Sequence, residues 1–223
     1  MQISIIIPTL NAANSLARTL AVLRSAPVGE IIVADGGSAD GTASLAEAAG
    51  AKLITAPRGR GTQLAHGAAV AAGEWLLFVH ADCLLEPVWE EAVAEFVAAP
   101  GAEGRAGFFD LALDDPCPAA RRLERIVAWR CRAFALPYGD QGLLISRMLY
   151  DAVGGFAPLP LMEDVDLVRR LGRARLARIG VRCVASAARY RRYGYWRRPI
   201  RNLFCLSLYF LGMLPACIAR IYG

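Results

Sequence analysis

Three short segments of the chain carry carboxylates in positions where they can take part in chemistry: Asp35–Ser38 (DGGS), His80–Asp82 (HAD) and Glu163-Asp164. The first two directly follow apolar runs that are typical of buried strands. Carboxylates at the C-terminal ends of parallel strands meet at the ligand crevice of an open α/β sheet. There, one can bind a ribose or base, one can bind a divalent metal ion, and one can accept a proton. The pattern indicates an enzyme that handles a nucleotide-linked substrate.

Asp35 opens a turn of small residues between a predicted strand and a predicted helix. Small residues let the backbone approach a ligand closely, and an acid after the second strand of such a unit commonly binds a ribose or base. We therefore interpret Asp35 as the functional acid and Asp40 as the N-cap of the following helix. A tight turn with that cap alone is the alternative.

Arg58–Gln63 (RGRGTQ) lies between the third predicted strand and the next helix. Two arginines, two glycines and a helix N-terminus suit the binding of a phosphate group. A solvated basic turn explains the segment equally well.

Asp82 follows the fourth predicted strand, where Mg²⁺ or Mn²⁺ is usually held by few carboxylates together with substrate phosphates. His80 can serve as a second ligand, because Mn²⁺ accepts imidazole. The alternative for His80 is a histidine at the sheet edge that is hydrogen-bonded to backbone.

Glu163 and Asp164 open a predicted helix, where carboxylates often only complement the helix dipole. The functional alternative is a general base within reach of an acceptor hydroxyl. Asp140 and Gln141, which precede a short predicted strand, offer a charge and an amide that suit sugar hydroxyls.

The elements that must position these residues alternate regularly in the first hundred positions. Strands are predicted over 2–8, 30–34, 51–56 and 75–79, and helices over 14–24, 39–50, 62–72 and 87–98, with Asn11 or Asn14 capping the first helix and Gly50 ending the second. This alternation predicts an α/β fold with a doubly wound, mostly parallel sheet of the Rossmann-like kind.

The pattern changes after Pro100. We predict strands over 104–113, 142–146 and 179–185, an Arg-rich amphipathic helix over 119–134, a helical turn over 148–153 and a helix over 163–171. Six arginines fall within 189–201, and 203–219 is a nearly unbroken apolar run that contains Pro215. The expected organisation is one domain over 1–200, with a nucleotide-binding half (1–99) and an acceptor-binding half (100–200), followed by an apolar helical segment over 201–223.

Composition excludes several classes of protein. Hydrophobic residues make up 56% of the 223 positions and charged residues 20%, so disorder is not expected. Residues 1–120 hold 6 Lys/Arg against 14 Asp/Glu, whereas 121–223 hold 19 against 6. The acidic half is no nucleic-acid surface, and we predict no nucleic-acid partner. The basic half can meet phosphate, anionic lipid or an acidic partner.

The six cysteines are widely spaced and form no CxxC pair, so a zinc site is not expected. Because the chain starts directly on a predicted strand, we expect no signal peptide. We expect free thiols and a cytoplasmic location.

The motifs in their order resemble those of the inverting family 2 glycosyltransferases. The segments are IIIPTLN, ADGGSADGT, RGRGTQ, GEWLLFVHAD, GDQGLLIS, GGF and MEDVDLVRRL, and they cover about Ile3 to Leu171. Single motifs are weak, but their order and spacing together are specific. Within this family, the segments HAD and GDQ are similar to those of a bacterial subgroup. The resemblance implies the GT-A fold of the nucleotide-diphospho-sugar transferases.

The resemblance also implies roles for individual residues. Asp82, with His80, would bind Mn²⁺ or Mg²⁺, and Asp164, or alternatively Glu163, would deprotonate the acceptor. Asp140 and Gln141 would contact the acceptor or sugar. The nucleotide-binding set would be Pro8, Thr9, Asn11, Asp35, Gly37, Arg58, Arg60, Gln63 and Ala81.

The reaction that the resemblance implies is a metal-assisted direct displacement. A sugar would move from a nucleotide-diphospho-sugar to an acceptor hydroxyl, and its anomeric configuration would invert. UDP is the preferred nucleotide. Two positions depart from the family pattern: Gly36 stands where an aspartate is usual, and His80 replaces the first aspartate of D-x-D. These departures keep open an alternative, a sugar-nucleotide-binding protein with weak or no turnover.

Two further classes fit poorly. An NAD-type oxidoreductase would need G-x-G-x-x-G after the first strand, where this chain has Pro-Thr-Leu-Asn. A nucleotidyltransferase would need a Gly-rich basic loop at the same place.

The C-terminal segment has two interpretations. The apolar run of about 17 residues is short for a bilayer span, which needs roughly 20. With the preceding arginines, 189–223 suits an interfacial helix on the inner face of the cytoplasmic membrane, and a lipid-linked acceptor would fit that interpretation. A buried helix or a homodimer contact explains the segment equally well.

Overall fold

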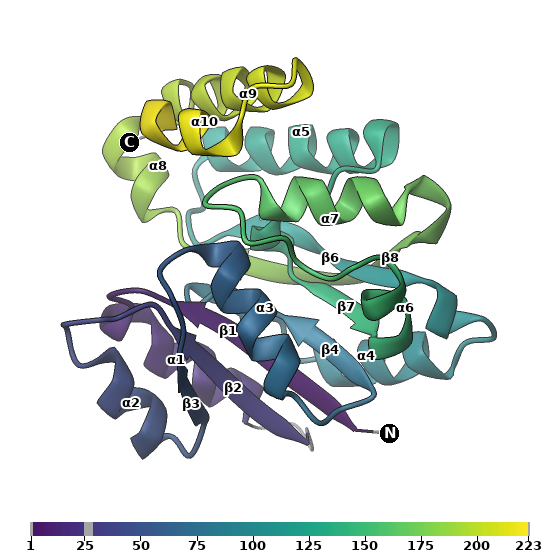
Figure 1. The fold of residues 1–223 in the computed structure, drawn as a ribbon. Coiled ribbons are helices and arrows are strands. Elements are labelled where there is room, and N and C mark those ends of the chain that lie inside the picture. Colours follow the sequence, from purple (N-terminus) through teal and green to yellow (C-terminus); the bar gives the residue numbers. More distant parts are fainter. Residues whose placement is uncertain (1, 25–28, 223) are drawn as a thin grey trace.

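The computed structural model describes residues 2–24 and 29–222, and these form an eight-stranded mixed sheet covered by helices on both faces (Figure 1). The strands are β1 (Ile3–Thr9), β2 (Glu30–Asp35), β3 (Lys52–Thr55), β4 (Trp75–Phe78), β5 (Cys83–Leu85), β6 (Ala106–Leu113), β7 (Leu143–Ser146) and β8 (Leu176–Ala185). Their order in the sheet is β3-β2-β1-β4-β7-β6-β8-β5. The predicted α/β fold is confirmed.

The first half of the sheet is parallel and the second half is mixed. β1 pairs in parallel with β2 and β4, and β2 with β3, so their C-terminal ends lie along one edge. β7 runs antiparallel to both β4 and β6, whereas β8 is parallel to β6. The sheet therefore joins a doubly wound half to an α+β half.

Helices connect and cover the strands. They are α1 (Ala13–Leu23), α2 (Thr42–Ala48), α3 (Arg60–Val70), α4 (Trp89–Ala98), α5 (Pro118–Phe134), α6 (Arg147–Ala152), α7 (Glu163–Leu171), α8 (Ala188–Tyr193), α9 (Arg197–Phe210) and α10 (Pro215–Tyr222). Three short 3₁₀ turns, η1 (Ala102–Gly104), η2 (Gly139–Gln141) and η3 (Arg173–Arg175), complete the elements within the described residues.

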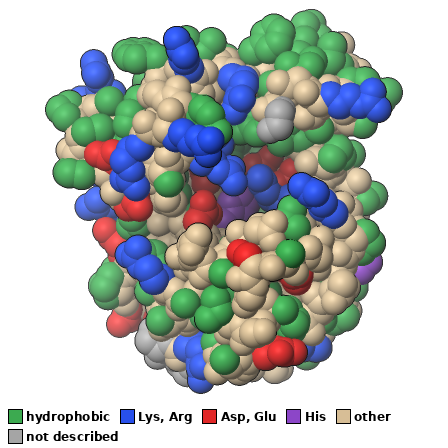
Figure 2. All heavy atoms as spheres, turned by 90° about the vertical axis from the view of Figure 1, so that its left-hand side faces the viewer, with side chains coloured by type: hydrophobic (Ala, Val, Ile, Leu, Met, Phe, Trp, Pro, Cys, Tyr) green, Lys and Arg blue, Asp and Glu red, His purple; other side chains and the backbone are tan. Residues whose placement is uncertain are grey.

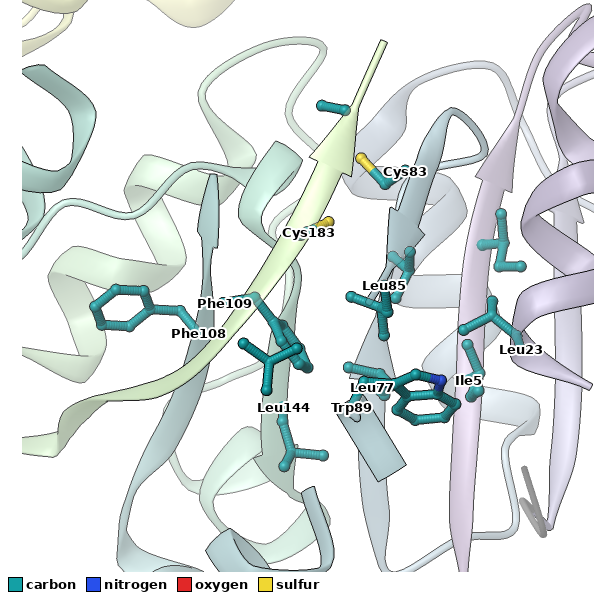
Figure 3. Close-up of a cluster of buried hydrophobic side chains, with 14 of the residues drawn as sticks. Ile5, Leu23, Leu77, Cys83, Leu85, Trp89, Phe108, Phe109, Leu144 and Cys183 are labelled. Carbon is teal, nitrogen blue, oxygen red and sulfur yellow. The ribbon is translucent and has the colours of Figure 1, made fainter. Parts of the chain in front are cut away.

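Alternating side chains of the strands divide the core into two layers. Ile5 and Ile7 of β1 face the layer beneath α1, α4 and α5, and Ile6 between them faces the layer beneath α3, α6 and α7. This is the two-residue period of a strand that is buried on both faces. Figure 3 shows the first layer, in which labelled side chains of six strands meet Leu23 of α1 and Trp89 of α4.

A third apolar cluster fixes the C-terminal helices. Cys205 and Leu206 of α9 and Ile218 of α10 pack with Met162 and Val165 at the start of α7. Figure 1 shows α9 and α10 lying together above α5 and α7. The C-terminal helices therefore hold the first turn of α7 in place.

The structure corrects several sequence expectations. Neither Asn11 nor Asn14 caps α1: Ala12 is its N-cap, and the Asn11 side chain instead accepts a hydrogen bond from the Ala39 amide. Gly41, not Asp40, is the N-cap of α2, although the Asp40 carboxylate accepts from the Thr42 amide at 3.2 Å.

Two further differences from the sequence analysis come from long-range packing. β5 was not predicted, because it spans only three residues and pairs with β8 about a hundred positions away. The apolar run 203–219 is no single helix, since α9 ends at Phe210 and α10 begins at Pro215. Among the described residues, we find no helix with the length and hydropathy needed to cross a bilayer.

Candidate active site

A cavity of about 400 Å³ lies at the C-terminal ends of β1 and β4. The ends of these strands, the start of α3 and Arg189 of α8 supply its walls, which include Pro8, Thr9, Asn11, Arg58, Arg60, Gln63, His80, Ala81 and Asp82. The structure thus brings together most residues predicted to bind the nucleotide. We call this the donor cavity after that prediction.

Asp35 and Gly37 are not among the residues that line the donor cavity. The Asp35 carboxylate is buried and accepts hydrogen bonds from the Thr9 hydroxyl at 2.8 Å and from the amides of Gly37 and Ser38 at 3.0 and 2.7 Å. Burial alone would raise the pKa of Asp35, but a hydrogen bond from the Ser38 hydroxyl, together with the three above, outweighs it and holds the pKa below its ordinary value. Asp35 fastens its own turn to β1 beside the cavity.

The amide of Gln63 ties the ends of β1 and β2 to α3. Its Nε2 donates to the carbonyl oxygens of Thr9 and Ala34 at 2.6 and 2.8 Å. A Cβ at Gly36 would lie 3.1 Å from the Gln63 side chain. Any side chain at position 36 would therefore press on Gln63, which would have to shift by a few tenths of an ångström.

A second cavity of about 140 Å³ adjoins the first, and we call it the acceptor cavity after the role predicted for Asp140 and Asp164. Arg60, His80, Asp82 and Arg189 line both cavities. Beyond this shared wall, Asp164, Asp140 and several tyrosines line the acceptor cavity and not the donor cavity. Figure 2 shows the hollow at the centre of this face, where basic, acidic and histidine side chains gather.

Asp164 lies in the first turn of α7 and lines the acceptor cavity. Its Oδ2 accepts a hydrogen bond from the Gly139 amide at 2.7 Å. The helix begins after Met162, whose φ of 65° turns the chain sharply into α7. The positive end of the helix dipole stabilises a negative charge on this carboxylate.

Glu163 does not line the acceptor cavity. It is 1% exposed and forms an ion pair with Arg60, with 3.1 Å between Nη1 and Oε1. Burial, helped by the charge of Asp164, raises the pKa of Glu163 to about 7. Of the two adjacent carboxylates, only Asp164 faces the cavity.

His80, Asp82 and Cys83 bring their potential ligand atoms within 4.8 Å of one another. Burial, together with the positive charges of Arg60 and Arg189, lowers the pKa of His80 well below its ordinary value, so the imidazole is neutral and keeps a lone pair. A hydrogen bond with the Cys183 thiol, together with burial, raises the pKa of the Cys83 thiol. A neutral imidazole and a carboxylate that both face the donor cavity fit Mn²⁺ or Mg²⁺, since these ions take few protein ligands.

Asp140 and Gln141, which we predicted to act as a pair, have side chains in different environments. Asp140 lines the acceptor cavity, and burial raises its pKa. The Gln141 side chain points inward, where Nε2 donates to the Phe109 carbonyl at 3.0 Å and Oε1 accepts from the Tyr138 amide at 3.2 Å. Gln141 therefore holds the η2 turn, and its amide lies away from the acceptor cavity.

Several lining residues carry no signal that sequence reasoning could use. Tyr138, Tyr190, Arg198 and Asn202 reach the acceptor cavity from η2, α8 and α9. The dense arginine run over 189–201 was the one sequence feature that pointed to this region, and it indicated only that Arg189 and Arg198 could bind phosphate.

Comparisons with known proteins identify the family of the chain and structures with a similar fold. The model of the family "Glycosyl transferase family 2" matches residues 4–153, which is more than half of the chain. No curated protein matches the sequence.

Solved structures resemble the fold. Glucosyl-3-phosphoglycerate synthase from Mycobacterium tuberculosis, in complex with Mn²⁺, UDP and glucosyl-3-phosphoglycerate, is 22% identical with a TM-score of 0.59, over 81% of this chain and 70% of that chain. The same enzyme in complex with Mg²⁺ and UDP is 22% identical with a TM-score of 0.59, over 81% of this chain and 69% of that chain. Mannosyl-3-phosphoglycerate synthase from Rubrobacter xylanophilus is 20% identical with a TM-score of 0.59, over 83% of this chain and 66% of that chain.

Proposed function

Because the chain belongs to glycosyl transferase family 2, we propose that it transfers a sugar from a nucleotide-diphospho-sugar to an acceptor hydroxyl by direct displacement with inversion. The observation that carries this proposal is the junction of two cavities at a shared wall of Arg60, His80, Asp82 and Arg189. A donor in one cavity and an acceptor in the other would bring the reacting atoms together at this wall.

We assign the nucleotide diphosphate to the donor cavity. The backbone amides at the start of α3 and the guanidinium groups of Arg58 and Arg60 offer donors to phosphate oxygens. Pro8, Thr9 and Asn11 would line the base and ribose. UDP is the preferred nucleotide, because the Mycobacterium tuberculosis enzyme with the same fold was crystallised with UDP.

Asp82 and His80 would hold Mn²⁺ or Mg²⁺. Such an ion, when bound, neutralises the negative charge that develops on the leaving diphosphate. Arg60 and Arg189 lie at the same wall and would stabilise that charge from the protein side.

Asp164 is the proposed general base. The acceptor O–H gives its proton to the Asp164 carboxylate, the acceptor oxygen forms a bond to the anomeric carbon, and the bond from that carbon to the diphosphate breaks. The nucleoside diphosphate leaves with the electron pair, and the configuration inverts. The Gly139 amide holds Oδ2 of Asp164, which keeps the carboxylate aimed at the cavity.

The same proposal puts the protein in the cytoplasm, with residues 189–222 against the inner face of the membrane. Arg191, Arg192 and Arg197 are exposed, and so are Phe204 and Leu211 of the following segment. Arginines beside exposed apolar side chains suit an anionic lipid surface.

Release of UDP from UDP-glucose, UDP-galactose and UDP-N-acetylglucosamine in Mn²⁺ tests the enzymatic proposal. We expect slow release with at least one of these donors, abolished by EDTA. The alternative is a sugar-nucleotide-binding protein without turnover, for which His80 and Gly36 are the motivating departures. Tight binding of a donor with no UDP release from any of the three would support that alternative.

A further inference from the structure

A third cavity of about 530 Å³ forms an apolar groove between α5 and α9. We infer that the acceptor is a lipid, whose apolar chain lies in this groove while its hydroxyl reaches Asp164. This inference rests on the proposed transferase function and adds to it the chemical class of the acceptor.

The groove exposes a large apolar surface. Ile126, Trp129 and Phe134 of α5 are 53%, 56% and 58% exposed, and Trp196, Ile200 and Leu203 on the opposite side are 63% to 64% exposed. Covering such side chains is worth about 25 cal/mol for each Å² of apolar surface removed from water. Contiguous apolar patches of this kind mark binding sites.

The groove adjoins the acceptor cavity, because Tyr138, Asp140, Tyr190 and Asn202 line both. A chain in the groove would therefore place its polar end beside the cavity that Asp164 lines. This adjacency favours a ligand of the active site over a second copy of the protein.

Two buried oxygen atoms at this junction lack hydrogen-bond donors among the described residues. They are Oδ1 of Asp140 and Oδ1 of Asn202. Leaving a buried acceptor unpaired is costly, and a hydroxyl-bearing head group supplies the missing donors. The junction is thus polar where the groove is apolar, which is the pattern of a polar head joined to a hydrocarbon chain.

Basic side chains lie on the two helices that form the groove. Arg122 and Arg125 of α5 and Arg197 of α9 are exposed, and the Arg122 guanidinium lies 5.7 Å from the ring centre of Trp196. Figure 2 shows hydrophobic side chains along the upper edge of the molecule, with lysine or arginine side chains below them. This charge complements an anionic membrane surface, from which a lipid would enter the groove.

Alkyl β-D-glucosides with chains of 4 to 10 carbons, kept monomeric, probe the groove directly. Tryptophan fluorescence reports binding, because Trp129 and Trp196 line the groove, and UDP release in Mn²⁺ reports use as an acceptor. We expect saturable binding whose dissociation constant falls roughly two- to fourfold for each added methylene. A dissociation constant that does not depend on chain length would overturn the inference.

Leu203→Asp places a charge in the groove, and Leu214→Asp is its matched control, because Leu214 is 69% exposed and does not line the groove. We expect Leu203→Asp to weaken binding of octyl glucoside at least tenfold and Leu214→Asp to leave it unchanged. Equal effects of the two variants, or a dimer that Leu203→Asp dissociates, would contradict a lipid occupant. The rise in Tm with UDP and Mn²⁺ is measured on the same proteins. Absence of this rise in the wild type would refute the transferase function. A rise in Tm together with glucoside dissociation constants that do not depend on chain length would refute only the lipid acceptor.

Discussion

The Gly139 amide donates a hydrogen bond to Oδ2 of Asp164 over 2.7 Å, and this contact joins the turn before β7 to the first turn of α7. The two segments are 25 residues apart in sequence, and His80 at the end of β4 lies against the same glycine. One small residue thus sets the spacing between the proposed base and the proposed metal site.

Gly139→Ala tests this spacing. The added Cβ would stand 2.6 Å from Nε2 of His80 and 3.4 Å from Oδ2 of Asp164, so the turn or the imidazole must move. We expect kcat to fall by roughly 10- to 100-fold, since displacement of a catalytic group by about 1 Å costs that much. UDP affinity in the absence of metal should stay within about twofold.

Gly104→Ala is the matched control, because a Cβ there meets no atom within 4 Å. It should leave both kcat and affinity unchanged. Equal activity of the two alanine variants would show that Gly139 does not set the active-site geometry.

Asp164→Asn removes the proposed base and keeps an oxygen that can accept from the Gly139 amide. We expect kcat to fall by roughly 10²- to 10⁴-fold, with the UDP dissociation constant unchanged. Asp166→Asn, two residues further along α7, serves as the control: Asp166 pairs with Arg170 at 2.6 Å and lines neither cavity.

Near-normal activity of Asp164→Asn would exclude Asp164 as the base. If Glu163→Gln lost activity instead, the adjacent carboxylate would take that role.

Glu163 gives the stability of the protein a distinctive pH dependence. In the native state the Glu163 carboxyl group has a pKa of about 7 and stays protonated below that pH, whereas in the unfolded chain it loses its proton near pH 4.5. Between these values the native state binds more protons, so this group makes the free energy of unfolding fall as pH rises and then level off above about 7. Glu163→Gln removes the titration.

Urea unfolding of both proteins from pH 4.5 to 8 measures this effect. The stability of the wild type minus that of Glu163→Gln should decrease by about 3 kcal/mol across pH 4.5 to 7. A difference that stays constant, or that increases with pH, would mean that Glu163 is ionised in the native protein.

The sequence was sufficient for most residues that follow strands, although Asp35 does not line the cavity. Apolar β-branched runs such as Ile3–Ile7 locate the strands, and parallel pairing then brings their ends together, so Thr9, Asp82 and the start of α3 meet as expected. Asp164 could be placed because it follows a recognisable helix start.

Side-chain direction and long-range packing could not be read from the sequence. Gln141 and Asp140 are neighbours, yet backbone partners draw the Gln141 amide inward while Asp140 faces the cavity. Asn202 of α9 lines the site, and α9 and α10 are held there by packing on Met162 and Val165, a contact that no local periodicity encodes.

Thermal unfolding in the presence of UDP, with and without Mn²⁺, tests the central claim most directly, when wild type and Asp82→Asn are compared. We expect UDP to raise the Tm of the wild type, Mn²⁺ to increase that rise, and Asp82→Asn to lose the Mn²⁺-dependent part while keeping the metal-independent part. The absence of any UDP-dependent rise in the wild type, or an unchanged effect of Mn²⁺ in Asp82→Asn, would contradict a metal-assisted sugar-nucleotide site at the end of β4.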